Sequence, residues 1–353
     1  MNDNKTVNKK ANNKKIVVEF ERTSKWTRFK LKYLSFNFLA VTVVRIFRFV
    51  MMLGISFVIL YPFIAKIAGS VMCKEDFVDV TVKLISKAPT FDQYKYIILE
   101  NKYLEALWNT TVLSLFCAVV QMLICCVVGY GIAKFKFKLS GLVFGAVLLT
   151  MAIPHEIVQF AMFRQFADFD ILWIRDLLTG GLIDGVKLVD PASWKGNLLG
   201  TDWPLVILSI TGLGFRNGLY IFMMRQFYRG VPDELEESAY IDGSGVFRTF
   251  FTIIIPLSVP MMITIFLFAF SWQWTDNFYT EVFYNTANSR LLMPDIVKVP
   301  KSLADPSFAG YNLYSSAIYN TAALLIIAPL LVIYLFCQKY LVQGIERSGL
   351  TAD

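Results

Sequence analysis

The sequence predicts an all-α membrane protein with six transmembrane helices, because of its composition and its long apolar runs. Hydrophobic residues make up 56% of the 353-residue chain and charged residues only 17%. A soluble domain has roughly 45–50% apolar and about 25% charged residues. Several apolar runs also reach the ~20 residues that a helix needs to cross a bilayer. We place the six spans near residues 50–70, 108–133, 141–163, 204–225, 257–279 and 316–338.

The segment before the first span divides into a polar tail and an apolar stretch that contains arginines. Residues 1–33 begin with a run rich in Asn and Lys, which predicts a disordered basic tail near anionic lipid. Residues 34–49 are apolar but contain Arg45 and Arg48, which would be costly near the bilayer centre. We therefore expect an amphipathic helix along the inner surface here. The long polar leader also favours a retained anchor over a cleaved signal peptide.

The distribution of Lys and Arg predicts how the chain is oriented. Residues 1–49 contain twelve basic and three acidic residues, and three lysines occupy the link at 134–138. Because cytoplasmic loops are enriched in Lys and Arg, both termini and the loop at 226–260 should be cytoplasmic. The loop at 164–203 is rich in Asp and should be external. The six-helix domain then covers 50–341, and residues 342–353 form a cytoplasmic C-terminal tail.

The polar island between the fourth and fifth spans predicts a helix, a glycine stop and a second helix. Pro232 suits a first helical position, and acidic residues follow it in the first turn, where the helix dipole favours them. Gly243 predicts a left-handed stop, since glycine takes that conformation at little cost. A second helix is expected from Ser244 as N-cap. Its apolar face would contain Phe247, Phe250, Phe251 and Ile254, with Pro256 and Pro260 marking a bend into the fifth span.

The same island resembles a known loop. Residues 237–244 spell E-S-A-Y-I-D-G-S, and Pro256 and Pro260 follow. This run resembles the coupling loop of permease subunits in bacterial ABC importers of the maltose-type, binding-protein-dependent sugar family. The family pattern is E-A-A-x-x-D-G-A, then I-x-x-P and a further proline. Ser238 and Ser244 stand where the family usually has alanine.

Further segments resemble sugar permeases of this family and follow in the same order along the chain. Together with the loop they cover about residues 45–347. The departures are the long leader, an enlarged 167–203 loop, and Arg216-Asn217 inside the fourth span. The segments are Trp108-Asn109-Thr110, Pro154-His155-Glu156, Met224-Arg225-Gln226-Phe227, Val231-Pro232-Asp233-Glu234-Leu235-Glu236, Trp272-Gln273-Trp274-Thr275-Asp276-Asn277 and Val342-Gln343-Gly344-Ile345.

The resemblance implies an importer in the bacterial plasma membrane. It would contain two permease subunits, a dimer of ATP-binding cassette ATPases and an extracytoplasmic solute-binding protein. This chain would form half of the path for a carbohydrate, with no cofactor and no nucleic-acid partner. The loop would dock on the ATPase, with Glu237 as the charged contact, although a solvated helix face is the open alternative for Glu237. The residues implied in coupling are Glu237, Ser238, Ala239, Asp242, Gly243, Ser244, Phe247 and Pro256.

A second set of residues is expected along the translocation path, because aromatic faces and amide or carboxylate groups suit hydroxylated rings. The open alternative is that the tryptophans pack between helices or anchor at the membrane surface. Arg216 lies nine residues before Arg225, so ~1.5 Å per residue places it about 14 Å deep. It would either form a structural pair or contact the solute. The candidates are Arg216, Asn217, Trp272, Trp274, Asp276, Asn277 and Glu156.

Enzyme motifs are not found. The sequence has no G-x-x-x-x-G-K-[ST] phosphate loop, so ATP hydrolysis is expected in a partner chain. Its single histidine, His155, is followed four residues later by Gln159, which breaks the zinc-protease pattern. The five cysteines are mostly inside apolar spans and predict neither a disulfide framework nor a metal site. The alternatives are an ABC permease for a non-sugar solute, a secondary transporter or a membrane-bound enzyme. A secondary transporter would have no use for the coupling loop.

Overall fold

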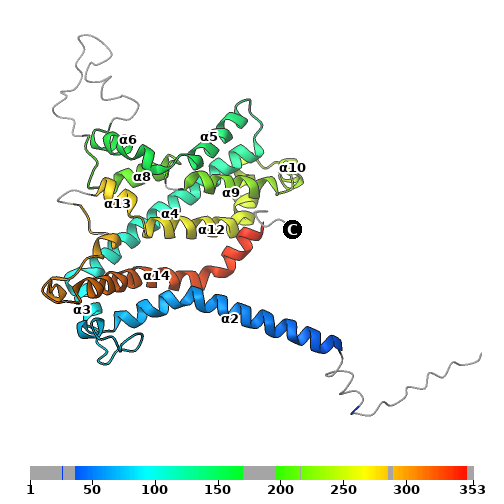
Figure 1. The fold of residues 1–353 in the computed structure, drawn as a ribbon. Helices are drawn as coiled ribbons and strands as arrows, with labels where there is room; N and C mark the ends of the chain where they lie inside the picture. The colour runs from blue at the N-terminus through cyan, green and yellow to red at the C-terminus, as the bar shows by residue number, and fades with distance from the viewer. Residues whose placement is uncertain (1–25, 27–35, 170–195, 215, 285–288, 348–353) are drawn as a thin grey trace, which may run out of the picture. The chain divides into compact units, whose positions relative to one another are not determined.

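All regular structure in the described part of the chain is helical, as the sequence predicts (Figure 1). The chain divides into two compact units, Met1–Ile64 and Ala65–Asp353, and both candidate functional regions belong to the second. Almost all of the predicted basic tail and most of the predicted external loop lie outside the described residues. A computed structural model of the protein describes residues 26, 36–169, 196–214, 216–284 and 289–347.

The first predicted span belongs to one long helix, α2 (Phe36–Ser70), which continues through residue 50 without a break. The predicted boundary between an interfacial helix and the span is therefore not visible in the backbone. Because α-helical hydrogen bonds are local, a helix can continue unbroken from one environment into another. The part of α2 that is apolar enough to span a membrane begins at Ala40. The position of residues 34–49 along the membrane surface stays a prediction.

Within the described residues, the structure recovers the predicted spans only in part. Four helices are long and apolar enough to cross a membrane, and one bent helix pair could supply a fifth span. The predicted six spans are not confirmed, because the third and the fourth are each divided into two helices. The four helical stretches are Ala40–Ser70, Tyr103–Lys134, Val246–Trp274 and Tyr311–Gln343.

The third predicted span is two helices, α5 (Ser140–Ala152) and α6 (His155–Ala167), whose axes differ by 101°. Pro154 explains the bend. The residue before a proline is pushed out of the α region, and Ile153 has an extended backbone with ψ 118°. The apolar composition of residues 141–163 correctly indicated a membrane segment, but it gave no indication of this turn.

The fourth predicted span is also divided, into α8 (Trp203–Ile210) and α9 (Asn217–Arg229). Gly212 has φ 74° and Arg216 has φ 66°, which are left-handed values that a right-handed helix excludes. A single helix over 204–225 is therefore wrong. Glycine reaches this region readily, whereas arginine does so only against steric resistance.

The fifth span and the second half of the coupling loop form one continuous helix. It comprises α11 (Val246–Thr249), the π-helical turn η4 (Phe250–Ile254) and α12 (Ile255–Trp274). The wide turn of η4 comes just before Pro256, where a bend is expected, and it relieves the clash of the proline ring with the preceding turn. A short helix, α13 (Phe278–Phe283), follows after a break.

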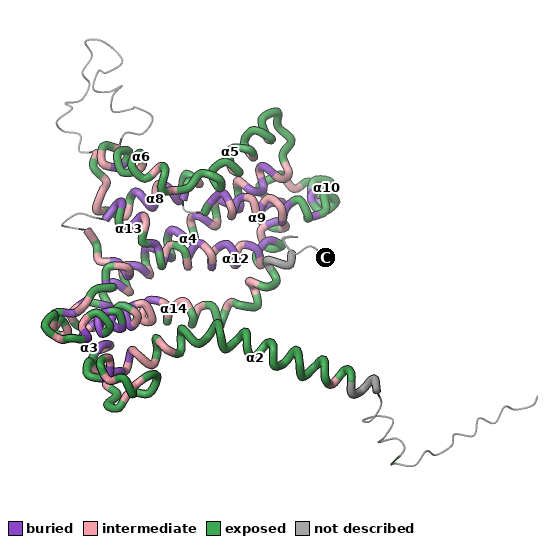
Figure 2. Tube along the Cα trace, viewed as in Figure 1, coloured by how far each residue is buried: buried purple, intermediate pink, exposed green. Residues whose placement is uncertain are grey.

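The core of the second unit is built around α4 (Tyr103–Lys134), which packs against α9 and α12 (Figure 1). Figure 2 shows the buried positions gathered on these three helices. Small residues allow the close approach, as is usual between membrane helices. At Gly129 of α4 an added Cβ would lie 2.6 Å from Met224 Cβ of α9.

Two helices complete this unit. The last one, α14 (Tyr311–Arg347), packs on α12 and extends past the predicted end of the domain at 341. The short helix α3 (Asp92–Glu100) packs on both α14 and α4. Just after α3, Asn101 Nδ2 donates hydrogen bonds to the carbonyls of Ile296 and Lys298, at 2.9 and 2.8 Å. The remaining 3₁₀ turns are η1 (Lys74–Phe77), η5 (Met293–Ile296) and η6 (Lys301–Leu303).

Candidate functional site

The coupling loop has the predicted helix–glycine–helix form. Its first helix, α10 (Glu234–Ile241), ends in a Schellman motif in which Gly243 has φ 80°. The Gly243 N–H donates to the Tyr240 carbonyl at 3.0 Å, and the Ser244 N–H donates to the Ala239 carbonyl at 2.9 Å. The left-handed stop at Gly243 is thereby confirmed.

Both helix starts in the loop differ from the prediction. The N-cap of α10 is Asp233, so Pro232 precedes the helix instead of opening it. The N-cap of α11 is Gly245 rather than Ser244. Such shifts of one or two residues are common, because the ends of helices have unsatisfied backbone groups and fray.

The base of α10 is attached to the end of α4. Lys134, the last residue of α4, has a side chain that is only 7% exposed. Its Nζ donates to Asp233 Oδ1 at 2.6 Å and to the Val231 carbonyl at 2.7 Å. This contact with Lys134 lowers the pKa of Asp233 below its usual value. Nearby, burial raises the pKa of Glu236. The first loop helix is therefore fixed to α4 at its N-terminal end.

The outer face of the loop is exposed and partly apolar. Ile241 is 86% exposed and Phe247 81% exposed, and Phe251 follows one turn later, also exposed. Large apolar side chains gathered on a surface mark sites of protein interaction. Sequence reasoning selected Phe247 but missed Ile241, although a large apolar residue in a polar loop was the available signal.

The other predicted coupling residues occupy different environments. Glu237, Ser238 and Asp242 are exposed, whereas Ala239 is on the buried face of α10. Pro256 is exposed at the start of α12. The exposed members are thus available to a partner, whereas Ala239 seats the helix on the rest of the unit.

The second candidate region is a cavity of about 360 Å³ between the two broken helices. One wall is the bend between α5 and α6, at residues 150–156, and the other is the break before α9. Three predicted path residues line it, namely Glu156, Arg216 and Asn217. The two departures from regular helix therefore meet at one polar cavity.

Arg216 is held against Trp272 of α12. The guanidinium carbon lies 4.6 Å from the centroid of the Trp272 ring, within the range of a cation–π contact. Both residues are exposed. The structure therefore brings a fourth predicted path residue, Trp272, against a residue that lines the cavity.

The rest of the W-x-W-x-D segment lies elsewhere. Trp274 is 1% exposed, and its Nε1–H donates to the Ile326 carbonyl of α14 at 2.9 Å. This placement favours the packing alternative for Trp274. Asp276 is buried and accepts the Tyr279 backbone N–H at 3.2 Å, and Asn277 is exposed.

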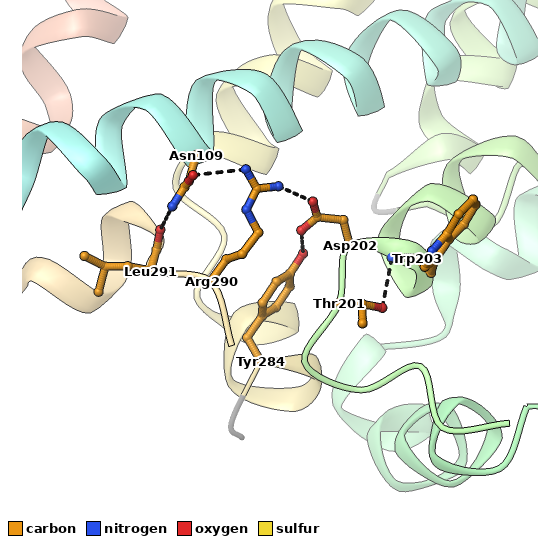
Figure 3. A network of polar contacts seen from close by, with 7 residues as sticks. All are labelled: Asn109, Thr201, Asp202, Trp203, Tyr284, Arg290 and Leu291. Carbon is orange, nitrogen blue, oxygen red and sulfur yellow. Dashed lines mark hydrogen bonds and ion pairs between the residues drawn. The ribbon is translucent and has the colours of Figure 1, made fainter. Parts of the chain in front are cut away.

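A polar network joins the segment before α8, the end of α13 and the start of α4 (Figure 3). Asp202 accepts hydrogen bonds from Arg290 and from the Tyr284 hydroxyl, the latter at 2.8 Å. Arg290 also donates to Asn109 Oδ1 at 3.0 Å, and Asn109 Nδ2 donates to the Leu291 carbonyl at 3.1 Å. Sequence reasoning found Asn109 only as part of a family segment, because its partners are far away in the chain.

Within the described residues, no group of three or more His, Cys, Asp or Glu side chains could hold a metal ion. All five cysteines are described, and each is free.

A polar cavity bordered by broken helices, inside an otherwise apolar helical protein, is how many transporters hold a solute within the membrane. The chain accordingly has the features of a multi-pass membrane transport protein. It belongs to the family described as the binding-protein-dependent transport system inner membrane component, whose family model matches residues 125–347. The resemblance found in the sequence is confirmed.

Three similar proteins have curated descriptions as permeases of saccharide transport systems. The arabinooligosaccharides transport system permease AraQ of Bacillus subtilis is 26% identical over 85% of this chain and 93% of its own length. The maltodextrin transport system permease MalD of Streptococcus pneumoniae is 26% identical over 84% of this chain and 92% of its own. The polygalacturonan/rhamnogalacturonan permease YtcP of B. subtilis is 25% identical over 85% and 94%.

A solved structure has the same fold. It is described as a bacterial ABC transporter involved in the import of the acidic polysaccharide alginate. The matched chain is 20% identical, with a TM-score of 0.62, and the match covers 85% of this chain and 97% of the other.

Proposed function

We propose that this chain is the permease subunit of an ATP-driven importer, forms half of the path for an oligosaccharide, and transmits ATPase movement through residues 226–260. The proposal is supported by its family and by the oligosaccharide systems to which its relatives belong. The observation that carries it is the helix–glycine–helix loop with an exposed apolar face. An ABC permease for a non-sugar solute is the alternative.

The proposal includes the partners and the topology. A second permease subunit, a dimer of ABC ATPases and an extracytoplasmic solute-binding protein complete the importer in the bacterial plasma membrane. The bent pair α5–α6 and the pair α8–α9 each serve as one span, which makes six. Both termini and the coupling loop are cytoplasmic, and residues 164–203 are outside.

The continuous helix from Val246 to Trp274 gives the coupling a physical route. Phe247 lies at the loop end of this helix, and Trp272 lies near its other end, against Arg216. At ~1.5 Å per residue the two are separated by about 38 Å along the axis. Movement of a docked loop would therefore reach the cavity through one helix, with η4 as the place where it can bend.

In this mechanism the exposed coupling residues bind and the buried ones hold the loop in shape. Phe247 and Ile241 would enter an apolar cleft of the ATPase, and Glu237 would pair with a cationic group at its edge. Lys134 holds the N-terminal end of α10, so a displacement of the loop also acts on α4. At the other end of α10, Gly243 supplies a turn that other residues take only with strain.

The test compares two glycines in the loop. Gly243→Pro should leave the protein in the membrane but abolish ATPase association or uptake, because proline cannot adopt φ 80°. Gly245→Ala is the matched control, since Gly245 has φ −78° and open space around it. Glu237→Lys should have the same effect as Gly243→Pro. Normal uptake by a complex that carries both Gly243→Pro and Glu237→Lys would contradict the proposal.

A further inference from the structure

Arg225 of α9 is a cation without a counter-charge among the described residues. Its guanidinium carbon lies 3.7 Å from the centroid of the Phe144 ring of α5, which is a cation–π contact. Its Nε atom is buried without a hydrogen-bond partner, and no ion pair in the described part of the chain includes Arg225. Because a buried N–H without an acceptor is costly, we expect an acceptor from outside the chain at this position.

A second cation lies on the same face of α9. Arg229 follows Arg225 by four residues, so the two side chains are neighbours, and like charges at this spacing destabilise a helix. Arg229 is exposed and also belongs to no ion pair of the described residues. Asp233, which lies four residues further on, is already paired with Lys134. The end of α9 therefore carries positive charge that calls for an external anion.

The cation–π contact lies just inside the ends of its two helices. Phe144 is four residues after the start of α5 at Ser140, and Arg225 is four residues before the end of α9. At ~1.5 Å per residue, each lies about 6 Å from its helix end. Figure 1 shows these two ends on the same side of the second unit as α10. In the proposed topology this side is cytoplasmic, and an arginine at such a depth reaches the headgroups of the inner leaflet.

The helix that supplies Phe144 has an open apolar face. None of the residues of α5 is buried, although α5 packs on α9. An added Cβ at Gly141 or at Gly145, on either side of Phe144, would meet no atom within 4 Å. Leu142 is 71% exposed and Leu149 58% exposed. An acyl chain can therefore lie along α5 next to the basic end of α9.

We propose that a phospholipid with an anionic headgroup binds at the inner ends of α5 and α9. Its phosphate accepts hydrogen bonds from the Arg225 guanidinium, and Arg229 adds positive charge. Phe144 positions the guanidinium, and an acyl chain covers the open face of α5. Basic sites between membrane helices on the cytoplasmic side are suited to anionic headgroups. The depth of Arg225 favours a lipid over the ATPase, whose proposed contact is the exposed outer face of the loop at Ile241 and Phe247.

The inference uses only the orientation of the chain from the proposed function. Binding of a lipid in detergent does not depend on that orientation, so a negative result leaves the proposed function intact.

The experiment titrates dioleoylphosphatidylglycerol into the full chain purified in detergent, and native mass spectrometry gives the apparent Kd of the bound lipid. Dioleoylphosphatidylcholine has the same acyl chains and no net charge, and it is the lipid control. An excess of inorganic phosphate tests whether a free anion occupies the same site. The variants are Arg225→Gln, Arg225→Lys and Phe144→Leu. The control variant is Lys83→Gln, which removes the same charge from an exposed residue between η1 and α3.

For the wild type we expect phosphatidylglycerol to bind about tenfold more tightly than phosphatidylcholine, the effect of one charged hydrogen bond. Arg225→Gln should weaken the Kd for phosphatidylglycerol about fivefold or more and change that for phosphatidylcholine less than about twofold. Arg225→Lys should weaken it less than Arg225→Gln does, because the charge remains without the planar fork. Phe144→Leu should weaken it more than about twofold, since the guanidinium loses its support. Lys83→Gln should leave it unchanged.

Three results overturn the inference. The first is equal affinity of the wild type for the two lipids. The second is a Kd for phosphatidylglycerol in Arg225→Gln that matches the wild type. If this variant cannot be purified, unchanged affinity in both Arg225→Lys and Phe144→Leu has the same meaning. The third is release of the lipid by inorganic phosphate, which would identify the ligand as a free anion. A carboxylate of a partner subunit at Arg225 would give the second result together with loss of that subunit from the importer.

Discussion

The close packing of α4 on α9 predicts that one added methyl group destabilises the protein. Gly129→Ala would place a Cβ 2.6 Å from Met224 Cβ, 3.2 Å from the Arg225 backbone nitrogen and 3.3 Å from the Met224 carbonyl carbon. Carbon atoms in contact are usually ~3.5–4.0 Å apart, so the two helices would have to separate by roughly an ångström. Backbone atoms are among the neighbours, and a side-chain rotation cannot relieve the clash.

The expected cost follows from this geometry. Overpacking of a well-packed interior costs about 1–3 kcal/mol. The better helix propensity of alanine offsets roughly 0.5–1 kcal/mol of that. We therefore expect a net destabilisation of up to about 2.5 kcal/mol, which lowers the apparent Tm of this 353-residue protein by up to about 3 °C.

The assay is thermal unfolding of the detergent-purified protein, followed by size-exclusion chromatography. Gly131→Ala is the control, because Gly131 lies on the same helix two residues later and has nothing within 4 Å of an added Cβ. It should be neutral or slightly stabilising. An apparent Tm for Gly129→Ala equal to or above that of Gly131→Ala would refute the close contact between α4 and α9.

Two other predictions concern the loop and the topology. Lys134→Met should reduce uptake per ATP hydrolysed severalfold while the complex still assembles, since α10 loses its attachment to α4. The pKa of Asp233 is lowered in the folded protein, so this ion pair contributes its full stability above the ordinary Asp pKa. That stability is lost as the pH falls through the lowered pKa. The exchanged pair, Lys134→Asp with Asp233→Lys, should restore part of the coupling, and no recovery would argue against the attachment. A cysteine that replaces Asp190 should react with a membrane-impermeant thiol reagent in intact cells, and one that replaces Asn12 should not. The bias of Lys and Arg places the two positions on opposite sides of the membrane. The reverse labelling pattern would overturn the topology.

The sequence alone determined the features that depend on local physics. Membrane insertion depends on the summed apolarity of about 20 neighbouring residues, so the apolar runs identified the spans near 108–133, 257–279 and 316–338. The stop at Gly243 depends on the stereochemistry of one residue, and it was recovered for that reason. The coupling loop was identified by a local pattern of residue types, which led to the family.

Only the tertiary structure decided where the spans break and which side chains meet. Apolar residues occur on both sides of Pro154 and of the break before α9, so their summed apolarity could not show the 101° turn or that break. Arg216 meets Trp272 from 56 residues away, and Asp202 meets Arg290 from 88 residues away, whereas Trp274, two residues after Trp272, faces α14. These pairings depend on how one helix is rotated and shifted against another, and that register is set by close packing over the whole interface rather than by any short segment.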